Sequence, residues 1–183
     1  MMTQDIHHKG PNILITGTPG TGKSTLAAEL SDSTGLTYVN ISQLVKENEF
    51  FTGFDPELDC HILDEDRLID EIDEQMKEGG NIVDYHGCDF FPERWFDAVF
   101  VLRTDNASLY QRLEKRNYNM RKIQENVQCE IFQTILDEAK DAYRNDIVFE
   151  IFSNTPDDLH ENLQKIQFWI ENWKKSNQFN NNS

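Results

Sequence analysis

The chain has 183 residues, 38% of them hydrophobic and 27% charged, which is typical of one folded domain and leaves no room for a second large one. Asp and Glu outnumber Lys and Arg by 33 to 17, and the net charge is -16. Because an acidic surface repels phosphates, we expect no direct binding to nucleic acid or to an anionic membrane, whereas a basic protein partner would suit this charge.

Strand and helix patterns alternate along the chain, as in an α/β fold whose parallel sheet is covered on both faces. The first half predicts a buried strand at Asn12–Thr16, a helix at Lys23–Ser31, a strand at Thr37–Asn40, a helix capped by Ser42 that runs to about Glu49, an irregular stretch at Phe50–His61 with Gly53 and Pro56 as breakers, a helix from Asp64 or Asp66 to Gly79, and a strand at Asn81–Tyr85.

The second half predicts a strand at Ala98–Leu102, a helix at Asp105–Lys115, a long helix through Ile123, Val127, Ile131 and Ile135, a strand at Ile147–Phe152, and a last helix that begins at Thr155-Pro156 and runs to about Lys174. The Asn-rich residues 176–183 are polar enough to be disordered. Residues 1–175 therefore form the one expected domain.

The segment Gly17-Thr18-Pro19-Gly20-Thr21-Gly22-Lys23-Ser24 matches the phosphate-binding pattern G-x-x-x-x-G-K-[ST] at every fixed position, between a buried strand and a helix. Glycines let successive N–H groups converge on phosphates, and a helix N-terminus adds partial positive charge. Lys23 is expected to reach the β- and γ-phosphates, and Ser24 to offer its hydroxyl to Mg²⁺. The alternative is a glycine-rich turn without a ligand, but chance produces such a match in about one chain in a hundred.

A carboxylate at the end of a neighbouring strand is expected to hold Mg²⁺ through water. Asp84 follows Ile82 and Val83 and is the best candidate, with an ordinary strand-end turn residue as the alternative. His86, two residues further on, could orient water or a phosphate, and a purely structural role is an equal alternative.

The most basic stretch of this acidic chain is RLEKRNYNMRK, at residues 112–122. Phosphoryl transfer spreads negative charge over the transferred group, so the site needs cations. Because Asn117 and Asn119 interrupt the helical pattern, we predict a mobile basic loop that closes over the site as a lid, with a solvated run of charges as the alternative. Weaker candidates for the phosphate of a second nucleotide are Arg94, Arg103 and Lys46.

The three cysteines, Cys60, Cys88 and Cys129, are widely spaced and form no C-x-x-C pair, which is typical of reduced intracellular thiols. No apolar run reaches transmembrane length, and the N-terminus has no signal-peptide core. We therefore expect a cytosolic or nuclear location and no membrane contact.

These motifs resemble the nuclear adenylate kinase isoenzyme 6 family, which includes the coilin-interacting nuclear ATPase and the yeast small-subunit assembly factor Fap7. The similarity extends over about residues 11–173 and is carried by GTPGTGKST, VDYHGCDFFPERWF, RLEKRNYN and NVQCEIFQ. It implies the nucleoside monophosphate kinase fold, with a five-stranded parallel sheet flanked by helices, a monophosphate-binding segment at about 40–63 and a lid at about 115–125.

The resemblance also implies an activity, which is phosphoryl transfer from ATP to AMP, accompanied by ATPase activity and dependent on Mg²⁺. Members of the family act in the nucleus and cytoplasm, support maturation of small-subunit rRNA and bind the ribosomal protein uS11. We expect a monomer. The alternatives are an ATPase that remodels a ribosomal protein complex, with incidental kinase activity, and a binding module in which the loop only stabilises the fold.

The expected site residues follow from the motifs and the resemblance together. Catalysis is assigned to Lys23, Asp84, His86 and Arg116, and the metal to Ser24 and Asp84. The second nucleotide is assigned to Lys46 and Arg94. The residues expected to bind ATP are Gly17, Pro19, Gly20, Thr21, Gly22, Lys23, Ser24, Thr25 and Arg116.

Two departures from the family pattern bear on these assignments. Lys46 stands where an arginine is frequent, and a lysine cannot grip a phosphate bidentately. Asn117 stands where a glycine is frequent, although asparagine tolerates left-handed backbone angles.

Overall fold

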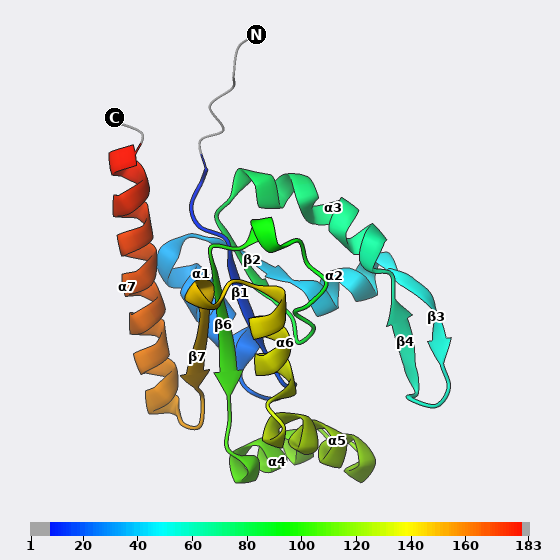
Figure 1. Cartoon of the computed structure of the whole chain (residues 1–183). Helices are drawn as coiled ribbons and strands as arrows, with labels where there is room; N and C mark the ends of the chain where they lie inside the picture. The colour runs from blue at the N-terminus through cyan, green and yellow to red at the C-terminus, as the bar shows by residue number, and fades with distance from the viewer. Residues whose placement is uncertain (1–7, 181–183) are drawn as a thin grey trace.

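The structure, a computed structural model, describes residues 8–180 (Figure 1). Its centre is a five-stranded sheet in the order β2-β5-β1-β6-β7, and every pair of neighbours is parallel, as predicted. The central strand β1 is buried along its whole length, which its apolar residues allow. The five strands are β1 (Ile13–Gly17), β2 (Thr37–Asn40), β5 (Asn81–Asp84), β6 (Ala98–Arg103) and β7 (Val148–Phe152).

Helices cover both faces of the sheet (Figure 1). On one face, α1 (Lys23–Thr34) and α7 (Pro156–Asn180) enclose a core that includes Leu26 and Ile166. The opposite face is covered by α2 (Ile41–Asn48), α3 (Glu65–Glu78) and α6 (Thr134–Ala142), together with the short 3₁₀ helices η1 (Glu93–Trp95) and η2 (Asn145–Ile147).

Two further helices, α4 (Asn106–Lys115) and α5 (Met120–Ile131), lie beyond the carboxyl ends of the strands and form a small core of their own around Leu109, Leu113 and Ile123. Ligands of open parallel sheets bind at this end, next to the loops that follow the strands. Among the described residues, no helix combines the length and the apolar character that a membrane crossing needs.

The prediction of an irregular stretch at Phe50–His61 is wrong. The chain there forms an antiparallel hairpin of β3 (Phe51–Asp55) and β4 (Cys60–Leu63), which projects from the body in Figure 1. Pro56 lies in the turn, where Asp55 accepts a hydrogen bond from the N–H of Glu57 at 2.9 Å. Across the strands the rings of Phe51 and His61 stack with centroids 4.4 Å apart.

The predicted long helix through Ile135 is two helices. Gln133 adopts a left-handed φ of 57°, which separates α5 from α6. Ile131 is 54% exposed whereas Ile123 is 2% exposed, so the four-residue recurrence does not describe one continuous buried stripe. The four-residue recurrence of apolar residues extends across Gln133 because α5 and α6 each have an apolar face, so it did not reveal that the helix is interrupted there.

Two helix ends also differ from expectation. Asn40, and not Ser42, caps α2, by accepting a hydrogen bond from Gln43 N at 3.1 Å. The expected disordered tail is corrected for residues 176–180, where α7 continues and the Asn177 side chain donates to the carbonyl oxygen of Trp173 at 2.8 Å. Residues 181–183 lie outside the described part of the chain.

Candidate active site

The phosphate-binding loop, residues 17–24, joins the buried end of β1 to the start of α1. A Cβ atom on Gly17 would lie 2.7 Å from the carbonyl oxygen of Leu102, so only glycine fits against β6. Gly20 has a φ of 93°, a left-handed angle that side chains rarely adopt. The loop therefore passes close to β6 and turns its backbone toward the N-terminus of α1, as a phosphate site requires.

Lys23 is held by its own loop. Its Nζ donates to the carbonyl oxygens of Gly17 at 2.9 Å and Thr18 at 3.1 Å. Burial lowers the pKa of Lys23 to about 8; the charge of Asp84 opposes this shift, and that of Arg116 adds to it. The ammonium group is therefore charged at neutral pH but poorly solvated. This favours the exchange of its two carbonyl partners for an incoming phosphate.

The predicted magnesium ligands Ser24 and Asp84 lie against each other. Ser24 Oγ donates to Asp84 Oδ2 at 2.9 Å, and the hydroxyl of Tyr38 donates to the same oxygen at 2.6 Å. Burial, followed by the hydrogen bond to Asp84, raises the pKa of Tyr38 to about 12, so this hydroxyl remains a donor. Parallel pairing of β2 with β5 places Asn40 beside Asp84 and brings Tyr38 to the same end of the sheet.

These oxygen atoms fit a magnesium ion. A hydroxyl and a carboxylate are the hard ligands that Mg²⁺ prefers. In residues 8–180, no group of three or more His, Cys, Asp or Glu side chains could hold a metal ion alone. An ion at Ser24 and Asp84 would therefore take its remaining ligands from phosphates and water, as is usual for P-loop enzymes.

His86 stands in the wall of the same cavity, open to it on one side and packed on Tyr85 with ring centroids 4.4 Å apart. The His86 side chain is exposed to the cavity, but the protein atoms around the ring desolvate it, and this desolvation, followed by the charge of Lys23, lowers the pKa of His86. The ring is therefore neutral at physiological pH. It can orient water or hydrogen-bond to a phosphate, but it supplies no positive charge.

Arg116 follows α4 directly and lines the cavity, where its charge acts on Lys23. Asn117 has a φ of 57°, and Asn119 caps α5 by accepting a hydrogen bond from Lys122 N at 2.8 Å. The two asparagines therefore interrupt the helix as predicted. The predicted lid segment is only partly a loop: residues 116–119 form the loop, and residues 120–125 are already the first turns of α5.

The other arginines of the basic stretch do not reach this cavity. Arg112 donates to the carbonyl oxygen of Asn154 at 3.1 Å, to Thr104 Oγ1 at 3.3 Å and to the carbonyl oxygen of Gly20 at 3.4 Å, so it joins α4 to the loop after β7 and to the phosphate-binding loop from outside the cavity. Arg121 pairs with Glu125 of its own helix at 3.0 Å. Of the arginines predicted for the lid, Arg116 is the one that the structure places at the site.

The cavity has a volume of about 600 Å³ and lies between the phosphate-binding loop, the β3–β4 hairpin and α5. Lys122 is a further cation in its wall, and its ammonium group lies 4.7 Å from the centre of the Tyr118 ring. Lys122, Asn126 and Cys129 all line the cavity from one face of α5, at helical spacing. If Asn119 had been recognised as the N-cap of a helix, the helical spacing would have placed Lys122, Asn126 and Cys129 on one face from the sequence alone.

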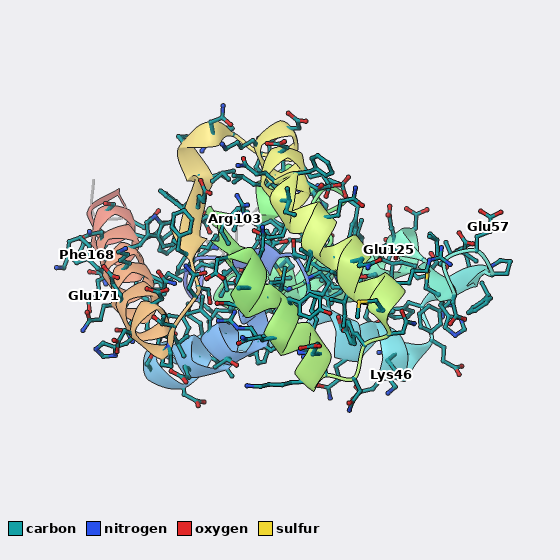
Figure 2. All side chains as sticks on the ribbon, turned by 90° about the horizontal axis from the view of Figure 1, so that it is seen from below. Lys46, Glu57, Arg103, Glu125, Phe168 and Glu171 are labelled. Carbon is teal, nitrogen blue, oxygen red and sulfur yellow. The ribbon has the colours of Figure 1, made fainter. Side chains whose placement is uncertain are left out.

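Several predicted residues lie elsewhere. The described residues that line the cavity include neither Lys46 nor Arg94. Arg94 pairs with Asp73 on α3 at 3.2 Å, and Lys46 is exposed on α2, where Figure 2 labels it. Pro19 does line the cavity, whereas Thr25 is exposed in the first turn of α1 and is not among the lining residues.

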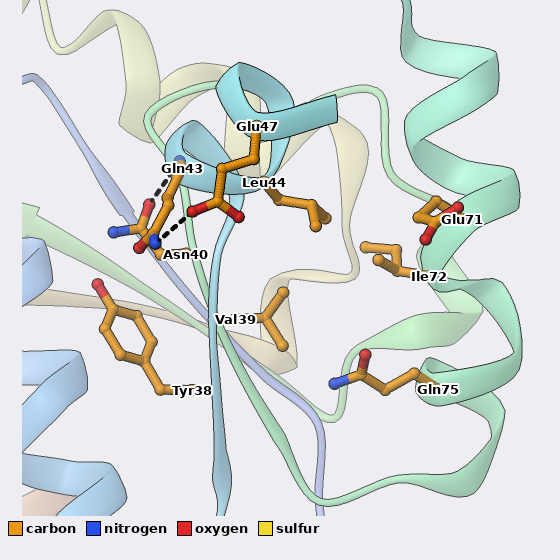
Figure 3. A pocket seen from close by; sticks show the side chains of 9 residues that line it. All are labelled: Tyr38, Val39, Asn40, Gln43, Leu44, Glu47, Glu71, Ile72 and Gln75. Carbon is orange, nitrogen blue, oxygen red and sulfur yellow. Dashed lines mark hydrogen bonds between the residues drawn. The ribbon is translucent and has the colours of Figure 1, made fainter. Parts of the chain in front are cut away.

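A second hollow of about 320 Å³ lies between α2 and α3 at the free edge of β2 (Figure 3). Val39, Leu44 and Ile72 supply apolar surface, and the two charged side chains drawn there are Glu47 and Glu71. Two carboxylates without a lining cation repel phosphates, so this hollow is not the nucleotide site.

Comparison with known proteins gives consistent matches. Residues 13–133 match the family described as AAA domain. The chain is 52% identical to the adenylate kinase isoenzyme 6 homolog of Dictyostelium discoideum, over 94% of this chain and 99% of that protein. It is 42% identical to the adenylate kinase isoenzyme 6 homolog FAP7 of Saccharomyces cerevisiae, over 90% of this chain and 84% of that protein.

Solved structures with little sequence similarity share the fold. A shikimate kinase from Bacteroides thetaiotaomicron superimposes with a TM-score of 0.60 at 14% identity, over 88% of this chain and 98% of that one. The parallel sheet with its phosphate-binding loop is thus the architecture of P-loop kinases.

Proposed function

Because this chain belongs to the adenylate kinase isoenzyme 6 family, we propose that it is a nucleotide kinase that transfers the γ-phosphoryl group of ATP to AMP and also hydrolyses ATP slowly. One observation carries the proposal: the phosphate-binding loop, the Ser24–Asp84 pair and the cations Arg116 and Lys122 meet in a single cavity. Phosphoryl transfer needs such a set of phosphate-binding backbone, metal ligands and cations in one place.

The donor nucleotide would be held at the phosphate-binding loop. Lys23 leaves the carbonyl oxygens of Gly17 and Thr18 and binds the β- and γ-phosphates. Arg116 neutralises charge that develops on the transferred group. Ser24 and Asp84 would hold a Mg²⁺ ion, which would supply positive charge at the phosphates. His86, as a neutral ring, orients water or an oxygen of the transferred group.

The acceptor would lie on the hairpin side of the cavity, where His61 and Asn40 contribute to the wall. Since Lys46 and Arg94 do not line this space, we assign the acceptor phosphate to Lys122, together with Arg116. Closure of the lid excludes water, which would otherwise compete with the acceptor for the phosphoryl group. Incomplete closure accounts for the ATPase activity.

The test uses Lys23→Ala with Lys46→Ala as a matched control, because both remove a lysine and only one lies at the site. In a coupled assay for ADP, Lys23→Ala is expected to lower transfer to AMP and hydrolysis by about 100-fold or more. Lys46→Ala should keep both the transfer to AMP and the hydrolysis of ATP at the rates of the unaltered protein. Equal turnover of Lys23→Ala and the unaltered protein would refute the site. Radiometric transfer to a panel of nucleoside monophosphates then identifies the preferred acceptor.

The chain has 33 acidic and 17 basic residues, and this acidic character suits a basic protein partner, which favours a second candidate function. In this alternative, an ATPase cycle remodels a complex with a basic partner such as the ribosomal protein uS11, and kinase activity is incidental. Pull-down of that protein with and without ATP tests the idea. Binding that is absent, or unaffected by ATP, would argue against it.

A further inference from the structure

Glu130, near the end of α5, is a buried carboxylate with 3% exposure to which the mechanism above gives no part. Its Oε2 accepts a hydrogen bond from Thr18 Oγ1 at 2.6 Å, and its Oε1 pairs with Arg103. Arg103 also donates to the backbone oxygen of Glu130 at 3.0 Å and to Glu150 at 3.1 Å. A buried carboxylate is costly unless it is paired and hydrogen-bonded, so these contacts hold Glu130 in one position.

Thr18 is the first variable residue of the phosphate-binding loop and is fully buried. Its carbonyl oxygen accepts from Lys23 Nζ at 3.1 Å and from Thr21 Oγ1 at 2.8 Å. When Lys23 turns toward a phosphate, the first of these bonds is lost. The hydrogen bond from Thr18 Oγ1 to Glu130 remains and ties Thr18 to α5, while Arg112 of α4 donates to the carbonyl oxygen of Gly20 at 3.4 Å.

That element is the helix of the lid. α5 begins directly after the loop that follows Arg116, and it carries Lys122 into the cavity near its first turn. Glu130 lies in the last turn, where Arg103 of β6, labelled in Figure 2, ties it to the sheet. A helix moves as a nearly rigid body. A change in the position of Glu130, in the last turn of α5, therefore also moves Lys122, near the first turn.

We propose that Glu130 is a positioning residue: by holding Thr18 on one side and Arg103 on the other, it couples the state of the phosphate-binding loop to the position of the lid helix α5. The proposal deepens the proposed function and rests on it, because it states how ATP at the loop prepares the acceptor side of the cavity. Glu130 touches no substrate in this scheme and acts through Thr18 and α5.

Paired substitutions isolate the contact. Thr18→Val keeps the shape of the side chain and removes the hydroxyl, whereas Thr18→Ser restores a hydroxyl at the same place. Glu130→Gln provides a second, less selective route, since it removes the carboxylate charge that faces Arg103 and that also favours the charged form of Lys23. Glu150→Gln is the control within the same network, because Glu150 contacts Arg103 but neither Thr18 nor Glu130 in the hydrogen bonds of the described residues. Thermal unfolding first confirms that each variant is folded.

The first readout is independent of turnover. A non-hydrolysable ATP analogue with Mg²⁺ is added, and hydrogen exchange is followed separately for residues 17–23 and 120–131. In the unaltered protein, Thr18→Ser and Glu150→Gln, the analogue should slow exchange in both segments. In Thr18→Val and Glu130→Gln, protection of 120–131 should fall by about tenfold while 17–23 stays protected, because the first variant loses a buried hydrogen bond and the second loses the charge of a buried ion pair. Equal protection of 120–131 in all variants overturns the proposal.

The second readout is the ratio of ATP hydrolysis to transfer. A misplaced α5 leaves water in the cavity, so the ratio should rise in Thr18→Val and Glu130→Gln and return toward normal in Thr18→Ser. If the unaltered protein transfers phosphate to AMP but the ratio is the same in all variants, the coupling is refuted and the kinase assignment stands. If it transfers none, the kinase assignment fails, and the exchange experiment alone decides the coupling.

Discussion

At the scale of single residues, Lys23 changes partners during the proposed reaction. In the structure its ammonium group donates to two carbonyl oxygens of the loop, and burial lowers its pKa to about 8. A phosphate is a charged and stronger acceptor than a carbonyl group, so binding of ATP raises the pKa of Lys23 again. Binding of ATP is therefore linked to proton uptake wherever free Lys23 is neutral.

This linkage predicts a pH dependence. Affinity for ATP is fully present below pH 8, where Lys23 is charged, and decreases as the pH rises above the pKa of the free protein. At pH 9 only about one molecule in ten carries the proton, so calorimetry should find affinity for an ATP analogue about tenfold weaker than at pH 7. Lys23→Arg should bind with little change over this range, because its guanidinium does not titrate. Equal affinity of the unaltered protein at both pH values would contradict the linkage.

For Arg116 we expect a different outcome, because its charge stabilises the group in transfer more than it contributes to binding of the triphosphate. Arg116→Ala should lower kcat by about 100-fold or more and weaken ATP–Mg²⁺ binding by much less. Calorimetry and steady-state kinetics separate the two effects. Lost binding with a proportionate loss of rate would assign Arg116 to substrate binding instead. Arg121→Ala is the control, since Arg121 pairs with Glu125 and does not line the cavity.

Single residues also show which parts of the site the sequence could predict. The loop from Gly17 to Ser24 is a local pattern with fixed spacing, so its residues could be named without a structure. Tyr38 could not, because its bond to Asp84 depends on β2 lying beside β5, and strand order is not a local property. Arg94 satisfied the chemistry of a phosphate ligand, but it lies in η1, where it pairs with Asp73 of α3 and does not line the cavity.

At the scale of elements, the position of α5 decides which cations meet the acceptor. The helix starts at Met120 behind the cap Asn119, so Lys122 lies in its first turn and enters the cavity. Lys122→Ala is therefore expected to raise KM for AMP by about tenfold with little change in KM for ATP, because a charged hydrogen bond to one substrate is lost. The measurement is initial rates over a matrix of both nucleotide concentrations.

Lys46→Ala is the matched control for this prediction, because Lys46 was the acceptor ligand expected from the sequence and stands exposed on α2. A rise in KM for AMP in Lys46→Ala and none in Lys122→Ala would reverse the assignment and place the acceptor against α2. A similar rise for both substrates in Lys122→Ala would show that the residue acts on the cavity in general.

Elements also differ in how well periodicity predicts them. The parallel strands and most of the helices were predicted because their sequences carry short apolar runs or apolar residues at helical spacing, even though the edge strands β2 and β7 are only partly buried. The hairpin of β3 and β4 was missed because its residues are mostly exposed, so no alternation between buried and exposed positions marks its strands. The break at Gln133 was missed because a single left-handed residue leaves no compositional signal.

At the scale of the whole molecule, charge and core act in opposite directions. The two cores on either side of the sheet stabilise the fold, whereas a net charge of -16 makes the folded surface repel itself. The ion pairs Arg121–Glu125 and Lys165–Glu161 are exposed and offset little of this repulsion. Repulsion between distant surface carboxylates is also the part of the electrostatic energy that dissolved salt screens most effectively.

The molecule should therefore become more stable as salt is added. Between about 10 mM and about 300 mM chloride the Debye length falls from about 30 Å to below 8 Å, which removes repulsion across the surface but leaves buried pairs such as Arg103–Glu130 in place. Each kcal/mol of relief should raise the unfolding midpoint by about 2–4 °C for a chain of this size. Sodium and potassium chloride should give the same curve, because screening depends on ionic strength and not on the ion. A midpoint that falls with salt would show that attraction between the surface charges outweighs their repulsion.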